Sequence, residues 1–599
     1  MKAPVFCLAL MMVACAPQPP LLPLPKEVRM EGGWVRAAEP EVVWVDSVPG
    51  ARLNGDEAYR IEVGKAGIRI ETSTDRGLWN ARQTLRQLSR DGRVPRCTIT
   101  DWPSFRVRGW MMDVGRTYIS MEELYREVDV FSQCKLNVFH LHLTENEAWR
   151  LESLKYPQLN DPGTMLRQPG LIYTQEQMRA LDARCRERGV LLVPEIDMPG
   201  HSGAFERAMG FGMQTPEGLA AVKDLLEEVM DVFSSPYIHI GTDEVQFTMP
   251  SFVPEVVGFV RSHGRKAVSW NPGWNYDPGE IDATQLWSWR GKARPGIPAV
   301  DSRLHYVNHF DLFGDIVGLH TSRICDACEG SDDLAGSIVA LWNDSYIPAE
   351  DAILRDNNLY AAAFALADRS WRGGGFQYFD DFGTVLPDGG PEREDFACFE
   401  SRMLPFLEGL PSDYVRQADA RWALSPVYPN GGDTQAVFPP EEGEWETERT
   451  VSGSGIYLRH VWGPSIVAGV YRDPLPNSTV YARARIHSGK AQTVRLLFET
   501  QNHSRSERDL PAPEGAWDWR HSRLWINGEE VLPPSGQLIS LSKGWNTVLV
   551  KLPVGEFSTP ETRLVKWMFT CAFLTPDGSA AAPLVYSGEP GAGNKKRPD

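Results

Sequence analysis

The sequence has little positive charge and few long apolar runs. Its 599 residues include 61 lysines and arginines against 79 aspartates and glutamates, so the formal net charge is −18. Nucleic acids and anionic membrane surfaces bind basic proteins, and this balance argues against both as partners. Beyond residue 14 no stretch is long and apolar enough to predict a transmembrane helix.

Metal-binding and disulfide patterns are also sparse. The nine cysteines lack the spacing of a disulfide framework. Cys325 and Cys328 form a CxxC, but no second pair completes a zinc site, so we interpret them as two loop thiols or a local disulfide. His142 and His201 fall on different predicted strands, and no HExxH motif is present. We therefore predict no metal site and no cofactor.

Tryptophan is abundant by contrast. The chain has 20 Trp, and such rings pack well against the flat apolar faces of sugars, although most must serve the core or domain interfaces. At this length we expect two to four domains.

The N-terminus resembles an export signal. Met1 and Lys2 precede an apolar run over residues 3–14, followed by Cys15 and a proline-rich stretch. The sequence MVAC resembles a bacterial lipobox, in which Cys15 would be lipidated. We expect a leader over residues 1–23, export to the bacterial periplasm or to the outer membrane or cell surface, and a lipid anchor.

Hydrophobic periodicity predicts a multidomain α/β protein. Short alternating strands and one amphipathic helix predict a small α+β domain, and eight alternations of apolar strand and helix then predict a (β/α)8 TIM-like barrel. An open doubly wound sheet is the alternative, but no glycine-rich phosphate loop follows the first strand. The regions are residues 24–105 (α+β), 106–380 (barrel), 381–430 (helical connector and linker) and 431–590 (a β-sandwich resembling a jelly roll). The barrel strands are expected near residues 107–114, 136–143, 189–198, 237–244, 266–270, 283–287, 304–308 and 337–342.

Each of these predicted strands ends in polar or aromatic residues. In chain order these are Asp113 and Arg116; His142 and Glu145; Asp197 and His201; Asp243 and Glu244; Trp270; Trp287 and Trp289; Tyr306 and Asn308; Trp342 and Asp344. A salt bridge, a core tryptophan or a helix cap explains any one of them, but packing alone does not explain all eight. In a barrel these ends meet on one face, where active sites are built. The groups suit a neutral polyhydroxylated ring held by hydrogen bonds and walled by aromatic rings.

The adjacency of Asp243 and Glu244 narrows the chemistry. Taken alone, YIHIGTDEV at residues 237–245 also fits a helix cap with a first-turn glutamate. Retaining glycosidases of the two-carboxylate type hold their acids about 5–5.5 Å apart, usually on different strands, whereas neighbours on one strand point in different directions. One carboxylate can instead serve the glycosidic oxygen while the other steadies a 2-acetamido group whose carbonyl oxygen attacks C1.

Four blocks, RGWMMDVGR, KLNVFHLHLTENEAWRLE, PEIDMPGHS and HIGTDE, resemble the signatures of glycoside hydrolase family 20, the β-N-acetylhexosaminidases. The resemblance covers residues 24–371. It implies that Glu244 is the general acid/base, that Asp243 orients the acetamido group and that Tyr306 hydrogen-bonds its oxygen. It further implies walls from Trp270, Trp342 and Trp289 (with Trp287 as a rival), hydroxyl binding by Arg116 and Asp344, and polar support from Asp197, His142 and His201.

Four positions depart from the family pattern. The family usually has Asp at Glu145, Gly at Thr242, Asp at Asn308 and Glu at Asp344. Because the acid pair is intact, the resemblance implies an active exo-β-N-acetylhexosaminidase that removes terminal β-linked GlcNAc or GalNAc from glycans, with altered hydroxyl or aglycone preference. The alternatives are a family member specialised for a sulfated or disaccharide terminus, and a non-catalytic glycan-binding lipoprotein.

Overall fold

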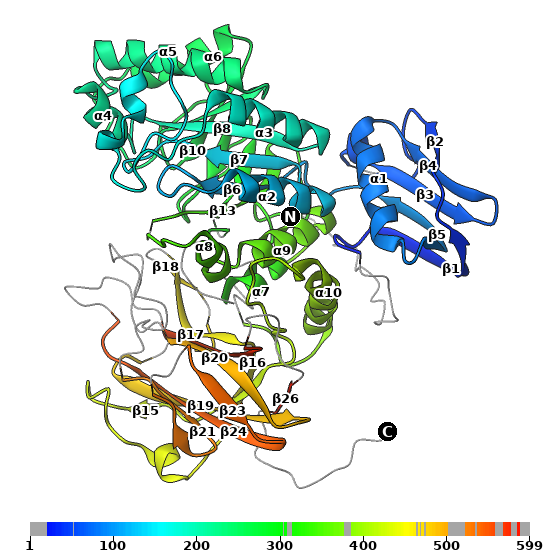
Figure 1. Cartoon of the computed structure of the whole chain (residues 1–599), viewed down its shortest axis with the longest axis vertical. Helices are drawn as coiled ribbons and strands as arrows, with labels where there is room; N and C mark the ends of the chain where they lie inside the picture. The colour runs from blue at the N-terminus through cyan, green and yellow to red at the C-terminus, as the bar shows by residue number, and fades with distance from the viewer. Residues whose placement is uncertain are drawn as a thin grey trace, which may run out of the picture.

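A computed structural model describes residues 21–587 of the chain apart from short gaps. The gaps are residues 52, 304, 308–313, 345, 377–384, 463–464, 468, 472–474, 501–520, 533–535, 558–566 and 577–583. Three bodies are visible: a small N-terminal sheet, a central barrel and a C-terminal sandwich (Figure 1). This arrangement confirms the predicted fold class. Asn308 and Cys15 lie outside the described residues.

The N-terminal unit is a five-stranded sheet with one helix on it. Its strands, in the order β1-β5-β3-β4-β2, are β1 (Glu27–Arg36), β5 (Arg93–Asp101), β3 (Tyr59–Gly64), β4 (Gly67–Thr72) and β2 (Glu41–Trp44). Helix α1 (Asp75–Leu88) begins where the Thr74 hydroxyl accepts a hydrogen bond from the Gly77 amide. Leu85 and Leu88 bury its apolar face against the sheet. Between strands β2 and β3 lies a short 3-10 helix, η1 (Gly55–Glu57).

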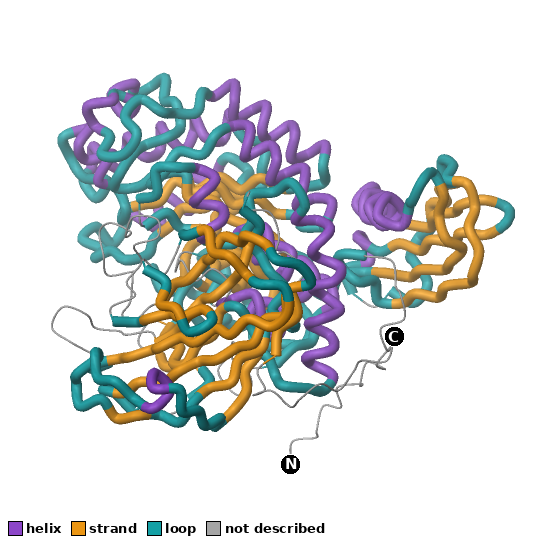
Figure 2. The backbone as a smooth tube through the Cα atoms, turned by 60° about the horizontal axis from the view of Figure 1, so that its bottom comes forward, coloured by secondary structure: helices purple, strands orange, loops and turns teal. Residues whose placement is uncertain are grey.

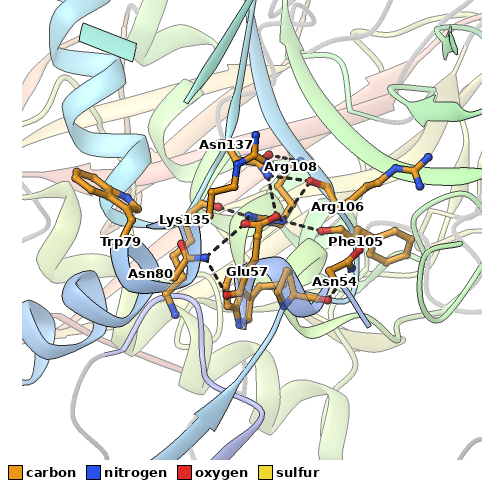
Figure 3. Close-up of polar contacts among 12 residues, drawn as sticks. Asn54, Glu57, Trp79, Asn80, Phe105, Arg106, Arg108, Lys135 and Asn137 are labelled. Carbon is orange, nitrogen blue, oxygen red and sulfur yellow. Dashed lines mark hydrogen bonds and ion pairs between the residues drawn. The ribbon is translucent and has the colours of Figure 1, made fainter. Parts of the chain in front are cut away.

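A buried ion pair joins this unit to the barrel (Figure 3). The guanidinium of Arg108 donates to both carboxylate oxygens of Glu57, at 3.0 and 2.5 Å. Asn137 and Asn80 donate two further hydrogen bonds to the same carboxylate, at 3.2 and 3.4 Å. Because every charge here is buried, the polar network fixes the N-terminal sheet on the first barrel strand.

The central body is a closed barrel of eight parallel strands. They are β6 (Val107–Asp113), β7 (Val138–His142), β8 (Leu191–Met198), β9 (Tyr237–Gly241), β10 (Lys266–Asn271), β11 (Ala283–Leu286), β12 (Ala299–Asp301) and β13 (Leu334–Leu341). The seventh strand was predicted at residues 304–308, and that prediction is wrong: β12 is three residues long and ends at Asp301. Tyr306 instead forms an isolated parallel bridge with Ala340, which explains its strand-like sequence.

Helices cover the outside of most of the barrel. They are α2 (Met121–Gln133), α3 (Gln175–Glu187), α4 (Gly203–Met209), α5 (Pro216–Val232), α6 (Phe252–Ser262), α7 (Gly314–Thr321), α8 (Glu350–Asp356) and α9 (Leu359–Arg372), followed by α10 (Pro391–Leu407). Two short 3-10 helices, η2 (Pro157–Asn160) and η3 (Pro162–Thr164), precede α3. Residues 272–282 and 287–298, which join β10 to β11 and β11 to β12, form turns and loops. Among the described residues, no helix has the length and apolar character needed to cross a membrane.

The C-terminal body is a sandwich of two antiparallel sheets (Figure 2). The larger sheet follows the path β16-β14-β19-β24-β21-β22, with β15 and β26 also paired to β19. Its strands are β14 (Arg421–Leu424), β15 (Tyr428–Pro429), β16 (Arg449–Ser452), β19 (Ser478–Ser488), β21 (Arg523–Ile526), β22 (Glu529–Glu530), β24 (Gly544–Val554) and β26 (Leu584–Ser587). The smaller sheet holds β17 (Gly455–Trp462), β18 (Ser465–Val467), β20 (Gln492–Thr500), β23 (Leu538–Leu541) and β25 (Trp567–Leu574). A further 3-10 helix, η4 (Pro439–Glu442), precedes β16.

The smaller sheet packs toward the barrel. Leu497, Ala572 and Leu574 on β20 and β25 belong to the same buried cluster as Phe399 of α10 and Ile316 of α7. The larger sheet therefore forms the side of the sandwich that faces away from the barrel (Figure 1).

Candidate active site

The carboxyl ends of the barrel strands bring most of the predicted site residues together. Asp113 and His142 end β6 and β7, and Asp197 lies one residue before the end of β8. Asp243 and Glu244 come one residue after the end of β9, and Trp342 directly follows β13. Polar side chains from four strands and an aromatic one from a fifth thus converge on one end of the barrel, as the strand-end pattern predicted.

Arg116 lies among three carboxylates at this end. Its Nη1 donates to Asp113 Oδ2 at 2.9 Å, its Nη2 contacts Glu145 Oε1, and its Nε lies 3.7 Å from Asp344 Oδ1. Burial opposes the charge on Arg116, but Asp113 and the other two acids outweigh it and raise its pKa. The guanidinium also lies over the ring of Trp342, 5.3 Å from the centroid. Arg116 is therefore a fixed cation with donors directed along one wall of the site.

His201 connects two of the acids. Its Nδ1 lies 2.5 Å from Glu145 Oε1, and its Nε2 lies 3.5 Å from Glu244 Oε2 and 3.9 Å from Asp243 Oδ2. Burial disfavours the imidazolium, but the contacts with Glu145 and Glu244 prevail and raise the pKa of His201 to about 12. His201 is consequently a cation that faces the acid pair.

The two adjacent carboxylates have opposite environments. Asp243 is buried, and burial, together with the nearby charges of Glu195 and Glu244, raises its pKa to about 6 against the opposing effect of His201. The side chain of Glu244 is 56% exposed, and the hydrogen bond from His201 lowers its pKa. One acid is thus enclosed by the site and the other faces its mouth, so they can act on different groups of a substrate.

Asp197 adds a third buried carboxylate beside Asp243. Burial first, and then the charge of Asp243, hold its pKa well above the usual range. Neither Asp197 oxygen, nor Oδ1 of Asp243, has a hydrogen-bond partner among the described residues. A Cβ at Gly241 would overlap the Asp197 carboxylate, which explains the glycine at that position, where φ is +64°.

Thr242 holds the turn that carries the acid pair. Its φ is +85°, a left-handed value that is unusual for a β-branched residue. Its hydroxyl lies 2.5 Å from Ser269 Oγ, and Ser269 in turn donates to the Gly241 carbonyl at 3.0 Å. The hydroxyl therefore links the strained turn to strand β10.

Aromatic rings form the floor and one wall of the site. Trp270 and Trp342 have ring centroids 5.7 Å apart, and Tyr306 lies 5.8 Å from Trp342. Trp287 packs partly buried in the same cluster, and its Nε1 donates to the Pro272 carbonyl at 2.6 Å. Trp289 is 41% exposed. The structure therefore brings Trp287, rather than Trp289, to the other rings.

A buried layer beneath the site was not identified from the sequence. Glu195 accepts from Trp270 Nε1 at 2.6 Å, and its oxygens lie 2.6 to 3.0 Å from nitrogens of His142, His140 and His239. Burial opposes the charge on His142, but Glu195 outweighs it and raises the pKa of His142 to about 9. Burial lowers the pKa of His140 to about 4.

The two-residue alternation of side chains along a strand could have predicted this layer from the sequence. His140 and Glu195 lie two residues before His142 and Asp197, and His239 lies four residues before Asp243, so their side chains point to the same inward face at a deeper level. The strand tips alone do not reveal this layer, because His140, the partner of His142 in the HLH segment at residues 140–142, lies one level below the tip.

Three groups of described side chains have the chemistry of metal ligands. In each group the ligand atoms lie within 4.8 Å of one another: His140, Glu195 and His239; His142, Glu195 and Asp197; Asp197, His201 and Asp243. Glu195 already has Trp270 and three imidazoles around it, and His201 Nδ1 is engaged by Glu145. A cation in either group that contains Glu195 would have to compete with contacts that Glu195 already makes, whereas in the third group the carboxylate oxygens of Asp197 and Oδ1 of Asp243 accept no hydrogen bond from the described residues.

Two family models match this part of the chain. The model described as "Glycosyl hydrolase family 20, catalytic domain" matches residues 105–217 and 207–275, and the one described as "Glycosyl hydrolase family 20, domain 2" matches residues 36–102. The matches include the acid pair and Trp270. Tyr306, Trp342 and Asp344 lie beyond them, so their place in the site rests on the barrel geometry alone.

Curated relatives are similar over the same region. "Beta-hexosaminidase" of Vibrio furnissii is 34% identical over 228 residues, which cover 31% of this chain and 37% of that protein. "Beta-N-acetylhexosaminidase" of Cellulomonas fimi is 31% identical over 288 residues, which cover 42% of this chain and 57% of that protein. The chain thus spans 37% and 57% of the lengths of these two relatives.

Solved structures share the fold. A β-N-acetylhexosaminidase from Bacteroides fragilis is 25% identical with a TM-score of 0.51, covering 60% of this chain and 93% of that chain. A family 20 exo-β-N-acetylglucosaminidase from Vibrio harveyi, solved with N-acetylglucosamine, is 21% identical with a TM-score of 0.53, covering 67% of this chain and 79% of that chain. Because the Vibrio harveyi protein is only 21% identical, its similarity shows a shared fold.

Proposed function

The chain belongs to glycoside hydrolase family 20 over residues 36–102 and 105–275, and from that premise we propose that it is an exo-acting β-N-acetylhexosaminidase. It removes terminal β-linked GlcNAc or GalNAc from glycans by substrate-assisted hydrolysis with retention of configuration. The observation that carries the proposal is the contrast within the acid pair. Asp243 is enclosed and has one oxygen without a hydrogen-bond partner among the described residues, while Glu244 is half exposed beside His201.

In the first step the acetamido group of the substrate acts as the nucleophile. Its carbonyl oxygen attacks C1 while Glu244 transfers a proton to the glycosidic oxygen. The C1–O bond breaks, the aglycone leaves with that proton, and a cyclic oxazolinium ion forms. Asp243 accepts a hydrogen bond from the acetamido N–H and offsets the positive charge of the ring.

In the second step water opens the oxazolinium ring. The Glu244 carboxylate now takes a proton from water, the water oxygen forms a bond to C1, and the bond from C1 to the amide oxygen breaks. The acetamido group is restored, Glu244 regains its proton, and one water is consumed per bond cleaved. Two inversions at C1 give net retention.

The protonation states of Glu244 and Asp243 suit these roles once a sugar is bound. In the free site, His201 lowers the pKa of Glu244, so this acid is ionised. A sugar that covers the exposed side of Glu244 removes water and disfavours the charged form, which prepares it as an acid. Asp243 has a pKa of about 6 and is ionised at neutral pH, as its role requires.

Neighbouring side chains position the sugar. Tyr306 is partly buried, and desolvation first and then the charge of Asp243 raise its pKa, so it stays a hydrogen-bond donor to the acetamido oxygen. Trp270, Trp287 and Trp342 wall the acetyl group and the sugar face. Arg116 and Asp344 bind ring hydroxyls through the donors and acceptors left at the rim.

Two aryl substrates test the mechanism. An aryl β-GlcNAc should be cleaved and the matching aryl β-glucoside should not, because only the former carries the nucleophile; equal rates would refute substrate assistance. Glu244→Gln should lose most activity on poor leaving groups and retain more on activated phenols. Asp243→Asn should impair all leaving groups alike, and a silent Asp243→Asn would remove its proposed role.

We propose in addition that the protein is exported and anchored through a lipid on Cys15. The support is the leader-like sequence and the lipobox-like MVAC. Fractionation of cells that produce the full chain and its Cys15→Ser variant tests this. The variant should move from the membrane fraction to the soluble exported fraction, and an unchanged distribution would refute the anchor.

A further inference from the structure

The outer face of the larger sandwich sheet carries arginines and tryptophans together. Strand β19 alternates in burial over residues 482–488, and its inward side chains Val480, Ala482, Ala484 and Ile486 are fully buried in the sandwich core. The alternate residues Arg483, Arg485 and His487 therefore point outward and are only half-buried. Trp545 on the paired strand β24 is opposite His487 and is 46% exposed.

Both of these arginines lie over tryptophan rings. The guanidinium carbon of Arg485 lies 4.8 Å from the ring centroid of Trp545, and that of Arg483 lies 4.2 Å from the ring of Trp445. His487 meets Trp545 edge-on, with centroids 5.2 Å apart. We call Arg483, Arg485, Trp445 and Trp545 the Arg–Trp face.

The two arginines of this face have no acidic partner among the residues that the structure describes. Neither Arg483 nor Arg485 forms an ion pair with a carboxylate among the described residues. By contrast, Arg523, which also lies over a tryptophan of this sheet, binds Glu530 at 2.6 and 2.7 Å and Glu441 at 3.0 Å. Within the described part of the chain, the absence of an acidic partner therefore distinguishes Arg483 and Arg485 from Arg523.

The two charges also repel each other. Residues two apart on a strand are about 6.8 Å apart on the same face. Burial first and then Arg485 lower the pKa of Arg483. On a chain with net charge −18, a pair of adjacent cations without acids is stabilised by an external anion.

We propose that the Arg–Trp face binds an anionic glycan, a chain of pyranose rings that bears sulfate or carboxylate groups. The exposed ring of Trp545 provides a flat apolar platform for a sugar face. A guanidinium stacked on such a ring keeps its N–H groups in the plane beside the platform, where they can form paired hydrogen bonds with an anionic substituent.

The chemistry favours this ligand over other polyanions. A neutral glycan would use the tryptophans but would leave both guanidinium groups without a counter-charge. A nucleic acid depends on phosphate contacts with many basic side chains, and here only two cations would contact it. An anionic glycan presents sugar rings and anionic groups in turn along its chain. These match the tryptophan rings and the guanidinium groups that lie side by side on the Arg–Trp face.

The face is separate from the barrel site. The larger sheet lies on the far side of the sandwich, beyond the smaller sheet that packs toward α7 and α10 (Figures 1 and 2). A glycan held there would tether the enzyme to its surroundings and raise the local concentration of chain ends without entering the barrel. The inference does not depend on the reaction proposed for the barrel.

Binding measurements on the full chain test the proposal. Calorimetry with a heparin oligosaccharide, a hyaluronan oligosaccharide and a neutral chitin oligosaccharide distinguishes sulfate, carboxylate and uncharged ligands. The Glu244→Gln background prevents hydrolysis during titration. We expect binding of at least one anionic oligosaccharide, a tenfold or greater loss in Arg485→Ala and in Trp545→Ala, and partial recovery in Trp545→Phe.

Arg449→Ala is the matched control. Arg449 also lies 4.8 Å from an aromatic centroid, that of Tyr471, but Glu448 is 3.2 Å away, so its removal should leave binding unchanged. Absence of anionic oligosaccharide binding would overturn the proposal. So would equal binding of duplex DNA that is insensitive to Trp545→Ala, because that result would show unspecific attraction of polyanions.

Hydrolysis of an aryl β-GlcNAc by the otherwise wild-type chain provides an independent readout. Arg485→Ala and Trp545→Ala should leave its kcat and KM unchanged, since the face is remote from the barrel. Loss of glycan binding with hydrolysis intact supports a distinct site. A matching fall in hydrolysis and thermal stability would show that these side chains only hold the sandwich together, and would overturn the proposal.

Discussion

Glu145 Oε1 lies 2.5 Å from His201 Nδ1, and this contact directs the other imidazole nitrogen of His201 toward Glu244. The charge of Glu145 therefore affects the pKa of Glu244 indirectly, because it stabilises the imidazolium of His201 that contacts Glu244. Glu145 also contacts Arg116, so its burial is compensated on two sides. Glu145 is thus a positioning residue for the acid, and the extra methylene that distinguishes it from aspartate keeps its charge in contact with the imidazole.

Glu145→Gln should shift the pH profile as well as reduce the rate. Without the carboxylate, the pKa of His201 falls, and the loss of the imidazolium raises the pKa of Glu244 toward its ordinary range. We expect kcat to fall about tenfold or more and the alkaline limb of kcat/KM to move to higher pH. Rates on an aryl β-GlcNAc between pH 4 and 9 measure both effects.

Glu145→Asp is the matched control because it keeps the charge. Its pH profile should remain close to that of the unmodified chain, with a modest change in kcat from the longer contact. If Glu145→Gln lowers the rate but leaves the profile unmoved, Glu145 acts only by packing, and the link to Glu244 is wrong.

Asp243→Asn should make the protein more stable at pH 8 while removing activity. The pKa of Asp243 is about 6 in the fold, against an ordinary value of 3.8. The folded state therefore binds more protons between these values, and stability is lost as pH rises from about 4 to about 6. The 2.2-unit difference corresponds to about 3 kcal/mol at most above pH 6. Thermal melts of both chains at pH 4 and pH 8 measure the gain, which should be confined to the higher pH.

The ionisation of Asp243 also predicts how kcat/KM falls on the acid side of the pH profile. Asp243 must be ionised to stabilise the oxazolinium charge, so kcat/KM should rise through about pH 6. The limb should be absent from the residual activity of Asp243→Asn. A melting gain of equal size at pH 4 and pH 8 would show that the carboxylate is not protonated in the fold and would contradict both expectations.

Thr242→Gly should be more stable than Thr242→Ala, although glycine usually destabilises a fold. At φ +85° any side chain with a Cβ is strained, at a cost of roughly 1–2 kcal/mol. Both variants lose the contact with Ser269 Oγ, so their difference isolates the strain. We expect Thr242→Gly to exceed Thr242→Ala by about 1 kcal/mol, measured from denaturant midpoints. If Thr242→Ala is more stable than Thr242→Gly, the backbone at residue 242 is not strained by a Cβ atom, and the expectation is wrong.

Much of the site could be predicted because barrel strands have a simple period. Polar residues at successive strand ends identified Arg116, His201 and the acid pair without any knowledge of loop conformation. The deeper layer around Glu195 was missed because its side chains look like ordinary buried strand positions until the closed barrel shows that four of them meet. That convergence depends on the closure of the barrel, which no single strand specifies.

Short elements and loops set the other limit. Strand β12 has three residues, too few for a periodic signal, and the bridge between Tyr306 and Ala340 gave residues 304–308 a strand-like pattern. The choice between Trp287 and Trp289 depended on the path of the turn that follows β11, which two residues of one type cannot specify. The structure places Trp287 partly buried in the cluster that contains Trp270 and Trp342, whereas Trp289 is 41% exposed.

Glu57→Gln should destabilise the junction between the N-terminal sheet and the barrel by roughly 3 kcal/mol. The side chains of Glu57 and Arg108 are 5% and 1% exposed, so the substitution leaves a buried guanidinium without its counter-charge (Figure 3). Glu62→Gln is the control, because its partner Arg60 lies at 2.5 Å but both side chains are at least one-third exposed. An exposed pair contributes less than about 1 kcal/mol. Denaturant midpoints of the full chain, followed by limited proteolysis of the N-terminal sheet, measure the difference. Equal effects of the two substitutions would show that the buried pair does not hold the junction, whereas partial recovery in Glu57→Gln/Arg108→Met would locate the cost in the stranded guanidinium itself.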